Sequence, residues 1–356
     1  MLELQRVKRT VLAIGSIAAC LASGLCAQSS WDPKSAANYL DSRAQWWSAW
    51  PSAARDHQTF CISCHTALPY AAARASLRTA LGERSPSPIE QKLLDNVIAR
   101  VRIWEQALPY YPNKNETDSK TAESRGTEAI LNAFVLTRYR SGPDADRALD
   151  HMWALQLTSG DAKGAFPWLQ FHNAPWEGDS QYYGATLAAL AAGSAAAPAG
   201  RGLESLKEYL RKDFAARTML DRVMLLWAST RLPGLLSAAE RDGIVGDALS
   251  RQQTDGGFSM SSFVGNWKRK DNTPLETRSD GYATGMVAFV LEEAGVRAGD
   301  PHIQASLAWL EKNQEPGDGR WLAYSLNKQR DLSSDVGKFM SDAATAYAVM
   351  ALSHSR

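Results

Sequence analysis

The sequence predicts an all-helical fold built from helical hairpins that stack side by side. Alanine and leucine are abundant, apolar residues recur at helical spacing, and no segment sustains the alternation of a strand. Two kinds of helical segment alternate along the chain, one amphipathic and one apolar throughout. An amphipathic helix keeps one face in water and an apolar helix is buried, so each consecutive pair is expected to form a hairpin.

The expected helices follow one another in order along the chain. Two come first, at residues 36–50 and 70–81. The amphipathic, outer set comprises residues 93–105, 145–156, 203–214, 238–253 and 303–313. The apolar, inner set comprises residues 126–139, 183–192, 219–231, 282–294 and 343–353. The chain is therefore expected to hold about six hairpins.

Residues 1–27 have the three regions of a secretory signal peptide. Basic residues between positions 6 and 9 precede an apolar run from 10 to 25, and cleavage is expected after Ala27. A retained membrane anchor is one alternative, since the run falls just short of the usual spanning length. A lipoprotein acylated at Cys20 is another. We expect a periplasmic or otherwise exported protein with no stable membrane span in its mature chain.

The segment Phe60-Cys61-Ile62-Ser63-Cys64-His65-Thr66 matches the Cys-x-x-Cys-His pattern of c-type haem attachment. Thiols at this spacing form thioethers with the two vinyl groups of the porphyrin, and the adjacent imidazole of His65 then binds the iron. Attachment takes place after export, so the leader and the motif support each other. We expect one covalent haem c.

Three other interpretations of the motif stay open. A structural zinc site needs four ligands, and the mature chain has no second cysteine pair to complete one. A thioredoxin-like dithiol is expected in a βαβ setting, which the surrounding sequence does not indicate. A structural disulfide between Cys61 and Cys64 suits an oxidising compartment but gives His65 no role.

The sixth iron ligand is not indicated by spacing, because no Met or His lies between His65 and His151. Candidates elsewhere are His57, His172, Met260 and Met340, or the position is open. A methionine in an apolar setting more commonly fills the core.

Two themes repeat along the chain. Loops that begin at Gln156, Gln253 and Gln314 combine Gln, Gly and an aromatic residue. Glycine permits the left-handed turn after a helix, and the Gln amide can bind carbonyls left free at the helix end. The inner helices repeat a small residue before Thr, which lets helices approach closely; the pairs are Gly126-Thr127, Ala185-Thr186, Ala283-Thr284 and Ala344-Thr345.

These loops resemble the Gln/Trp-type motifs of the prenyltransferase and squalene-cyclase repeat superfamily, and the upstream motif resembles its haem-bearing members. The resemblance implies an α/α toroid of inner helices around a central apolar cavity. It covers residues 85–356, preceded by a helical segment, 28–84, that carries the haem motif in its hairpin loop.

The chain departs from the enzymes of that superfamily. It has no Asp-x-Asp-Asp motif, so proton-initiated terpene cyclisation is not expected, and the toroid region has no Cys for a prenyltransferase zinc. Asp280 and Asp342 are single carboxylates at helix starts, where they are expected to stabilise the helix dipole.

We expect the haem to cap one mouth of the toroid, against the long loops 157–180, 254–279 and 314–341. Trp321, Tyr324, Lys328 and Arg330 are the expected surroundings, since aromatic rings can cover a porphyrin face and basic groups can pair its propionates. The alternative is that the aromatic residues seal the loops and the basic residues are solvated.

The near balance of 39 Lys and Arg against 38 Asp and Glu gives no indication of a nucleic-acid partner. The sequence favours a periplasmic monohaem c-type cytochrome that transfers electrons to a redox partner protein. The alternative is a haem-dependent oxidoreductase, or a terpenoid-type enzyme or binding protein, whose toroid cavity takes an apolar, isoprenoid-like small molecule.

Overall fold

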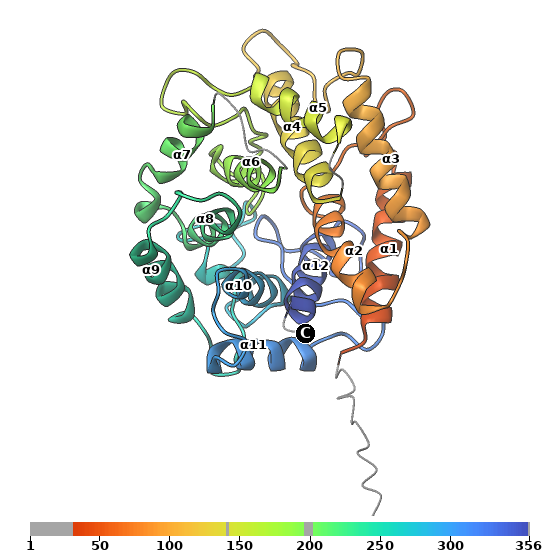
Figure 1. Cartoon of the computed structure of the whole chain (residues 1–356). Coiled ribbons are helices and arrows are strands. Elements are labelled where there is room, and N and C mark those ends of the chain that lie inside the picture. Colours follow the sequence, from red (N-terminus) through yellow and green to blue (C-terminus); the bar gives the residue numbers. More distant parts are fainter. Residues whose placement is uncertain (1–30, 140–141, 196–201, 355–356) are drawn as a thin grey trace, which may run out of the picture. The chain divides into compact units, whose positions relative to one another are not determined.

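Figure 1 shows the computed structural model of the chain, which describes residues 31–139, 142–195 and 202–354. The expected signal peptide, with Cys20, lies outside the described residues. Within the described residues, the regular elements are α-helices and two short 3-10 helices, η1 (Phe214–Ala216) and η2 (Met260–Ser262), and no strand is longer than an isolated bridge. No helix in these ranges is both long and apolar enough to span a membrane.

The helices of residues 31–354 form two concentric rings (Figure 1). The outer ring comprises α1 (Pro33–Ala49), α3 (Pro88–Arg102), α5 (Pro143–Ala154), α7 (Leu203–Arg211), α9 (Ala238–Leu249) and α11 (Pro301–Lys312). The inner ring comprises α2 (Ala67–Ala80), α4 (Lys120–Tyr139), α6 (Tyr182–Ser194), α8 (Met219–Arg231), α10 (Gly281–Glu293) and α12 (Phe339–His354). Each inner helix packs on the next, and α12 packs on α2, so the inner ring is closed. The expected α/α toroid of six hairpins is confirmed, and α1 and α2 form its first hairpin.

The burial of each helix follows its sequence pattern. Helix α7 buries only Leu206, Tyr209 and Leu210, a single stripe at helical spacing. Inner helices such as α10 and α12 are buried around nearly their whole circumference, because outer helices cover one side and inner helices the other. The assignment of amphipathic segments to the outside and apolar segments to the inside is confirmed.

Three glutamine-containing loops each tie one outer helix to the next outer helix. Nε2 of Gln314 donates to the carbonyl oxygens of Gly319 and Asp32, both at 2.9 Å, and its Oε1 accepts from the Asp32 N–H at 2.7 Å. Because Asp32 caps α1, this amide joins the last outer helix to the first. Gln156 does the same for Gly164 and for Gly202, the cap of α7.

In the loop between α9 and α10, the bridging glutamine is not the expected one. Nε2 of Gln252 donates to the carbonyl oxygens of Gly256 and His302, while Gln253 points to Thr277. Gln252 is the residue whose amide reaches the start of α11, so the repeat is offset by one position here.

Three of the four repeated threonines bind loops to inner helices, whereas Thr186 donates to the Tyr183 carbonyl of its own helix. The hydroxyl oxygen of Thr284 accepts from the Phe258 N–H at 2.9 Å, and that of Thr345 accepts from the Trp321 N–H at 3.1 Å. Helix α10 meets α12 closely at Gly285, where an added Cβ would lie 2.6 Å from the Ala348 nitrogen. The close helix approach therefore occurs beside the small-Thr pair, and the threonine holds the aromatic end of the loop.

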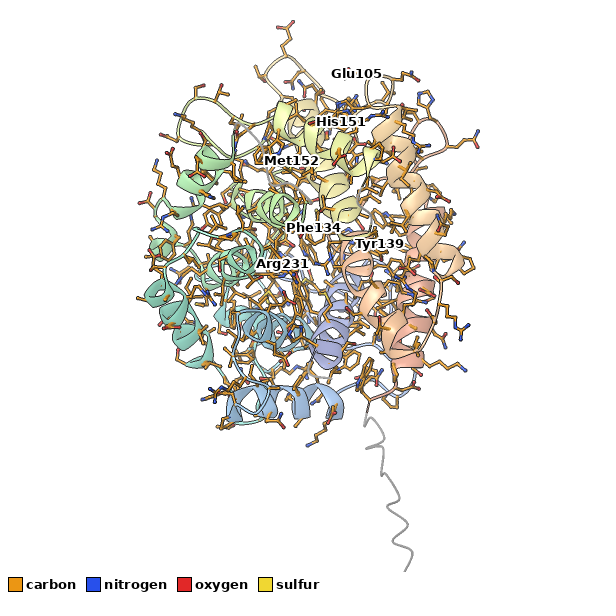
Figure 2. The ribbon with its side chains drawn as sticks, viewed as in Figure 1. Glu105, Phe134, Tyr139, His151, Met152 and Arg231 are labelled. Atoms are coloured by element: carbon orange, nitrogen blue, oxygen red, sulfur yellow. The ribbon has the colours of Figure 1, made fainter. Side chains whose placement is uncertain are left out.

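Aromatic rings fill the middle of the inner ring. Trp227 on α8 packs against Phe134 on α4, Phe289 on α10 and Tyr347 on α12, with centroids 6.1, 5.4 and 6.3 Å away. Figure 2 shows Phe134 towards the centre of the ring and His151, on α5, at its rim. Since these four helices surround the axis, their side chains occupy, at this level, the space where the resemblance implied an apolar cavity.

The long connections lie at one end of the toroid, where all inner helices begin. Asn327 Nδ2 donates to the Ala174 carbonyl at 2.7 Å, and the Trp267 indole donates to the Leu326 carbonyl at 3.0 Å. These bonds join the loops 155–181, 250–280 and 313–338 into one layer. The expectation that the long loops share one end is confirmed.

Candidate functional site

The Cys-x-x-Cys-His motif lies in the loop between α1 and α2, at the same end as the long loops. Its backbone is fixed to both neighbouring outer helices. The Trp47 indole of α1 donates to the Cys61 carbonyl at 2.7 Å, and the Asn96 amide of α3 bonds both the N–H and the carbonyl of Phe60. The Cys61 N–H donates to the Ala53 carbonyl at 2.9 Å.

Ser63, between the two cysteines, prepares the turn into α2. Its hydroxyl oxygen accepts from the N–H groups of Thr66 and Ala67, at 3.2 and 3.0 Å. It thereby satisfies two of the donors left free at a helix start. The motif therefore ends in a fixed helix entry that carries His65.

Cys61 and Cys64 are free and buried, at 5% and 3% exposure. Burial raises the pKa of Cys61 to about 11 and that of Cys64 well above its ordinary value. A redox-active dithiol needs a lowered pKa and access to solvent. These thiols therefore do not have the environment of a thioredoxin-like pair.

His65 lies in a cage of aromatic rings. The Phe339 ring stacks on its imidazole with centroids 3.7 Å apart and planes at 24°. Trp47 meets it edge-on at 4.9 Å, and Trp176 lies 5.6 Å away. Burial, helped by the charges of Arg43 and Arg330, lowers the pKa of His65 to about 3. The imidazole is therefore neutral at physiological pH and can act as a ligand.

A hydrogen-bond relay assigns the tautomer of this imidazole. The Thr66 hydroxyl donates to Oδ2 of Asp342 at 2.6 Å, and Nδ1 of His65 lies 2.9 Å from the same hydroxyl oxygen. Since the Thr66 proton points to the carboxylate, the Nδ1 of His65 must supply the proton of the second bond. This assignment puts the free lone pair on Nε2, the nitrogen that a metal would take.

Asp342 joins three segments of the chain. Its Oδ1 accepts from Arg43 Nε and from the Tyr39 hydroxyl, each at 2.8 Å, while Oδ2 accepts from Thr66. Burial raises the pKa of Asp342, and the pairing with Arg43 and the two hydroxyl donors oppose that rise. The expectation that Asp342 only stabilises a helix dipole is therefore incomplete. Asp280, in contrast, caps α10, since its Oδ1 accepts from the N–H groups of Tyr282 and Ala283.

A pocket of about 150 Å³ opens beside His65. Its walls come from the turn 173–177, the loop 325–337 and the start of α12. The lining residues are His65, Asn173, Trp176, Glu177, Ser325, Asn327, Arg330, Val336, Gly337, Phe339 and Met340. Of the expected surroundings and ligands, the structure therefore brings Arg330 and Met340 to the pocket of His65.

The other candidates lie elsewhere. Trp321 is buried against Trp31, with its indole donating to the Leu310 carbonyl. Tyr324 lies under the Arg278 guanidinium, and Lys328 is exposed. Met260 is buried in η2, and the exposed His172 pairs with Asp179 at 2.7 Å. His57 is exposed on the loop before the motif.

The side chains that line the pocket of His65 have the chemistry to bind a haem, but the pocket is smaller than a porphyrin. No cluster of three metal-binding side chains occurs in the described ranges, and haem iron needs none because the porphyrin supplies four nitrogens. The buried Oδ1 of Asn327 has no hydrogen-bond partner among the described residues, and burial raises the pKa of Glu177 to about 7. A porphyrin is larger than this pocket of about 150 Å³, so the residues fit a haem by their chemistry and not by the space between the walls 173–177 and 325–337.

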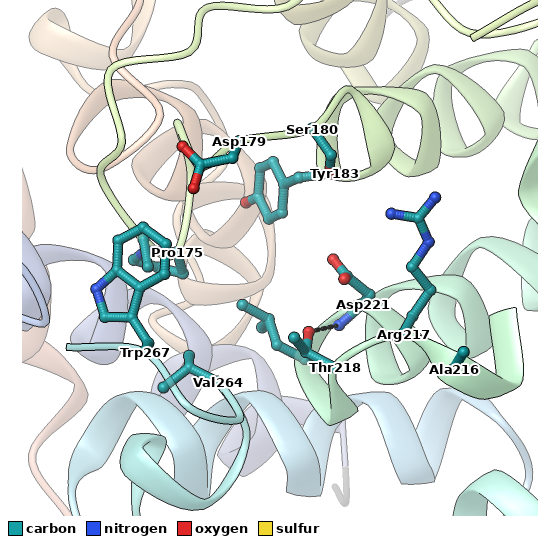
Figure 3. Close-up of a pocket in the computed structure, with 13 residues that line it drawn as sticks. Pro175, Asp179, Ser180, Tyr183, Ala216, Arg217, Thr218, Asp221, Val264 and Trp267 are labelled. Atoms are coloured by element: carbon teal, nitrogen blue, oxygen red, sulfur yellow. Dashed lines mark hydrogen bonds between the residues drawn. The ribbon is translucent and has the colours of Figure 1, made fainter. Parts of the chain in front are cut away.

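A second pocket, of about 330 Å³, lies at the same end between the starts of α6 and α8 (Figure 3). Pro175 and Trp267 form one side, Asp221 and Arg217 lie opposite, and Tyr183 projects into it. The residues 173–180 form the wall that it shares with the pocket of His65.

No protein-family model and no curated protein matches the chain. Among solved structures, the chain is similar to the apo form of the type II terpene cyclase MstE from Scytonema, with 14% identity and a TM-score of 0.48. The alignment covers 90% of this chain and 98% of that one. A likeness at this level decides neither fold nor chemistry, so both rest on the contacts above.

Sequence reasoning did not find several residues of the site. Thr66, Phe339 and Glu177 contact or neighbour the imidazole, yet only Thr66 lies near the motif in the chain. No local pattern marks an aromatic residue that will stack on a ring far away in the sequence.

Proposed function

We propose that the protein is an exported monohaem c-type cytochrome that carries electrons, with haem c bound through Cys61, Cys64 and His65. The observation that supports this best is the relay through Thr66, which leaves Nε2 of His65 as the free lone pair beside two thiols at the attachment spacing. The neutral imidazole suits iron ligation, and the raised pKa of the buried Cys61 thiol does not suit dithiol exchange.

Other residues of the pocket would bind the haem propionates and exclude water. Arg330 and the amides of Asn173 and Asn327 line it and could hold the propionates. Phe339 and Trp176 would exclude water from the ligand side of the porphyrin. When bound, haem supplies a one-electron iron couple.

The test is expression of the full chain in a host with cytochrome c maturation machinery. We expect a Soret band and haem that stays on the polypeptide in a denaturing gel. The Cys61→Ser/Cys64→Ser variant should lose the covalent haem, whereas Ser63→Ala, between the cysteines, should keep it. A wild-type protein without a Soret band would exclude the cytochrome.

A second candidate function rests on the 330 Å³ pocket of Figure 3, whose size suits a small metabolite. We propose, as the alternative, an oxidoreductase whose substrate binds in this pocket. The segment 173–180 is the wall between it and the pocket of His65. Bulk introduced by Val264→Trp should fill this pocket. A small molecule that co-purifies with the wild type but not with Val264→Trp, with the haem spectrum unchanged, would support the alternative. A wild-type protein without any co-purified small molecule would contradict it.

A further inference from the structure

Thr66 occupies the N-cap position of α2 but does not cap it. Threonine at this position normally accepts a hydrogen bond from a backbone N–H one turn later. Here its side chain makes no capping bond, and Ser63 takes that role. Thr66 is buried, with 2% of its surface exposed. Its hydroxyl instead bridges His65 and Asp342.

The hydrogen bonds that Asp342 accepts favour its ionised form. It is 1% exposed, and its two oxygens accept three charge-assisted or hydroxyl hydrogen bonds. Arg43 also pairs with Asp335, at 2.8 Å, so its single positive charge is shared between two carboxylates. The cluster of Arg43, Asp335 and Asp342 therefore holds one positive and two negative charges, and the Arg330 guanidinium lines the pocket on the other side of His65.

We propose that Asp342 and Thr66 are positioning residues for the haem ligand: they hold His65 as the Nδ1–H tautomer and make its Nε2 a stronger donor to iron. This inference rests on the proposed function. Outer hydrogen bonds from a carboxylate raise the basicity of a metal-bound histidine and fix its ring. A stronger donor stabilises ferric over ferrous iron, so the relay is expected to lower the reduction potential of the haem.

The first measurement uses the haem-free protein. Long-range proton–nitrogen NMR of ¹⁵N-histidine protein distinguishes the two tautomers, and the His65→Gln variant assigns the signal among the six histidines. We expect the Nδ1–H tautomer in the wild type and in Thr66→Ser, which keeps the hydroxyl. Thr66→Val should shift the imidazole towards the Nε2–H tautomer. A wild-type Nε2–H tautomer, or a Thr66→Val spectrum like the wild type, would overturn the proposal.

The second measurement uses the haem-loaded protein. Thr66→Val, which leaves the Arg43–Asp342 pair intact, should shift the reduction potential to more positive values and lower the iron–histidine stretching frequency. Thr66→Ser should restore both to the wild-type range. Equal potentials for Thr66→Val and wild type would overturn the proposal.

The two measurements distinguish a failure of the proposed function from a failure of the relay alone. A wild-type protein that attaches no haem contradicts the proposed function, and the tautomer remains measurable. A protein that attaches haem but shows no effect of Thr66→Val contradicts the relay alone. Asp342→Asn is the second variant, with the same expected direction, provided that its thermal unfolding shows a folded protein.

Discussion

The imidazole of His65 and the ring of Phe339 stack at a centroid distance of 3.7 Å, although 274 positions separate them in the chain (339 − 65). We expect Phe339→Leu to lower the free energy of unfolding. About 1 kcal/mol of this loss should come in addition to the loss of buried apolar area, since an aromatic pair contributes this much beyond its burial. It should also broaden the His65 NMR signals. Urea unfolding and NMR test this, with Phe214→Leu, a part-buried ring in η1, as the control.

Met340 lines the pocket of His65, whereas Met260 is buried in η2. If Met340 supplies the sixth ligand, the haem-loaded Met340→Leu variant should bind carbon monoxide more readily than the wild type. Met260→Leu should behave like the wild type. Equal carbon monoxide binding by all three proteins would mean that Met340 does not occupy the sixth position.

Arg100 and Glu128 form an ion pair in which both side chains are fully buried, with Nε 2.6 Å from Oε1. Arg100 also bonds Asp56 and Thr59, just before the haem motif. We expect Arg100→Met to destabilise the protein by about 3–5 kcal/mol, because a buried charge loses its partner. Arg102→Met, which breaks an exposed pair, should change the unfolding midpoint little.

Gly285 and Gly243 offer a matched pair of helix glycines. An added Cβ at Gly285 would lie 2.6 Å from the Ala348 nitrogen, whereas nothing lies within 4 Å at Gly243. Gly285→Ala should destabilise the protein by about 3 kcal/mol through backbone overlap. Gly243→Ala should stabilise it by about 0.5–1 kcal/mol through helix propensity. Thermal unfolding of both variants decides; similar midpoints would contradict the close contact of α10 and α12.

Glu292 is buried at 6% exposure, and its carboxyl oxygens have no hydrogen-bond partner among the described residues. Burial, with the charge of Glu293, raises the pKa of Glu292 to about 8. The folded protein therefore holds a proton that the unfolded chain releases near its ordinary pKa. The associated stability is complete below about pH 4.5 and is lost as the pH rises towards 8.

Glu292→Gln should remove this part of the pH dependence. We expect the variant to be more stable than the wild type at pH 9, by on the order of a few kcal/mol. The exposed Glu208→Gln on α7 is the control and should keep the wild-type profile. A wild-type stability that stays constant from pH 5 to 9 would contradict the raised pKa.

The helices could be predicted from sequence because their signal is local. The segment 219–231 coincides with α8, and the hairpin order is correct throughout the described chain. Helix ends were less accurate: α3 begins at Pro88, five positions before the expected start, where Ser87 and Glu90 form a capping box. That box can be recognised in the sequence as Ser-x-x-Glu just before an apolar stretch.

The site could be predicted only where its residues are contiguous. Cys61, Cys64 and His65 share one motif, so spacing alone identifies them. The contact of Thr66 with Asp342 depends on α12 closing the ring against α2, and no local pattern encodes that closure. Asp342 was therefore interpreted from its place at a helix start, and its link to His65 appeared only in three dimensions.

The bonds between Gln314 and Asp32 have a consequence for how the protein unfolds. In open repeat arrays, terminal repeats have only one neighbour and fray first. Here the hairpin of α1 and α2 is held by neighbours on both sides, so the described ring has no weak terminal repeat. Unfolding should therefore be a single cooperative event, and the loop that carries the Cys-x-x-Cys-His motif should stay in place until the whole ring opens.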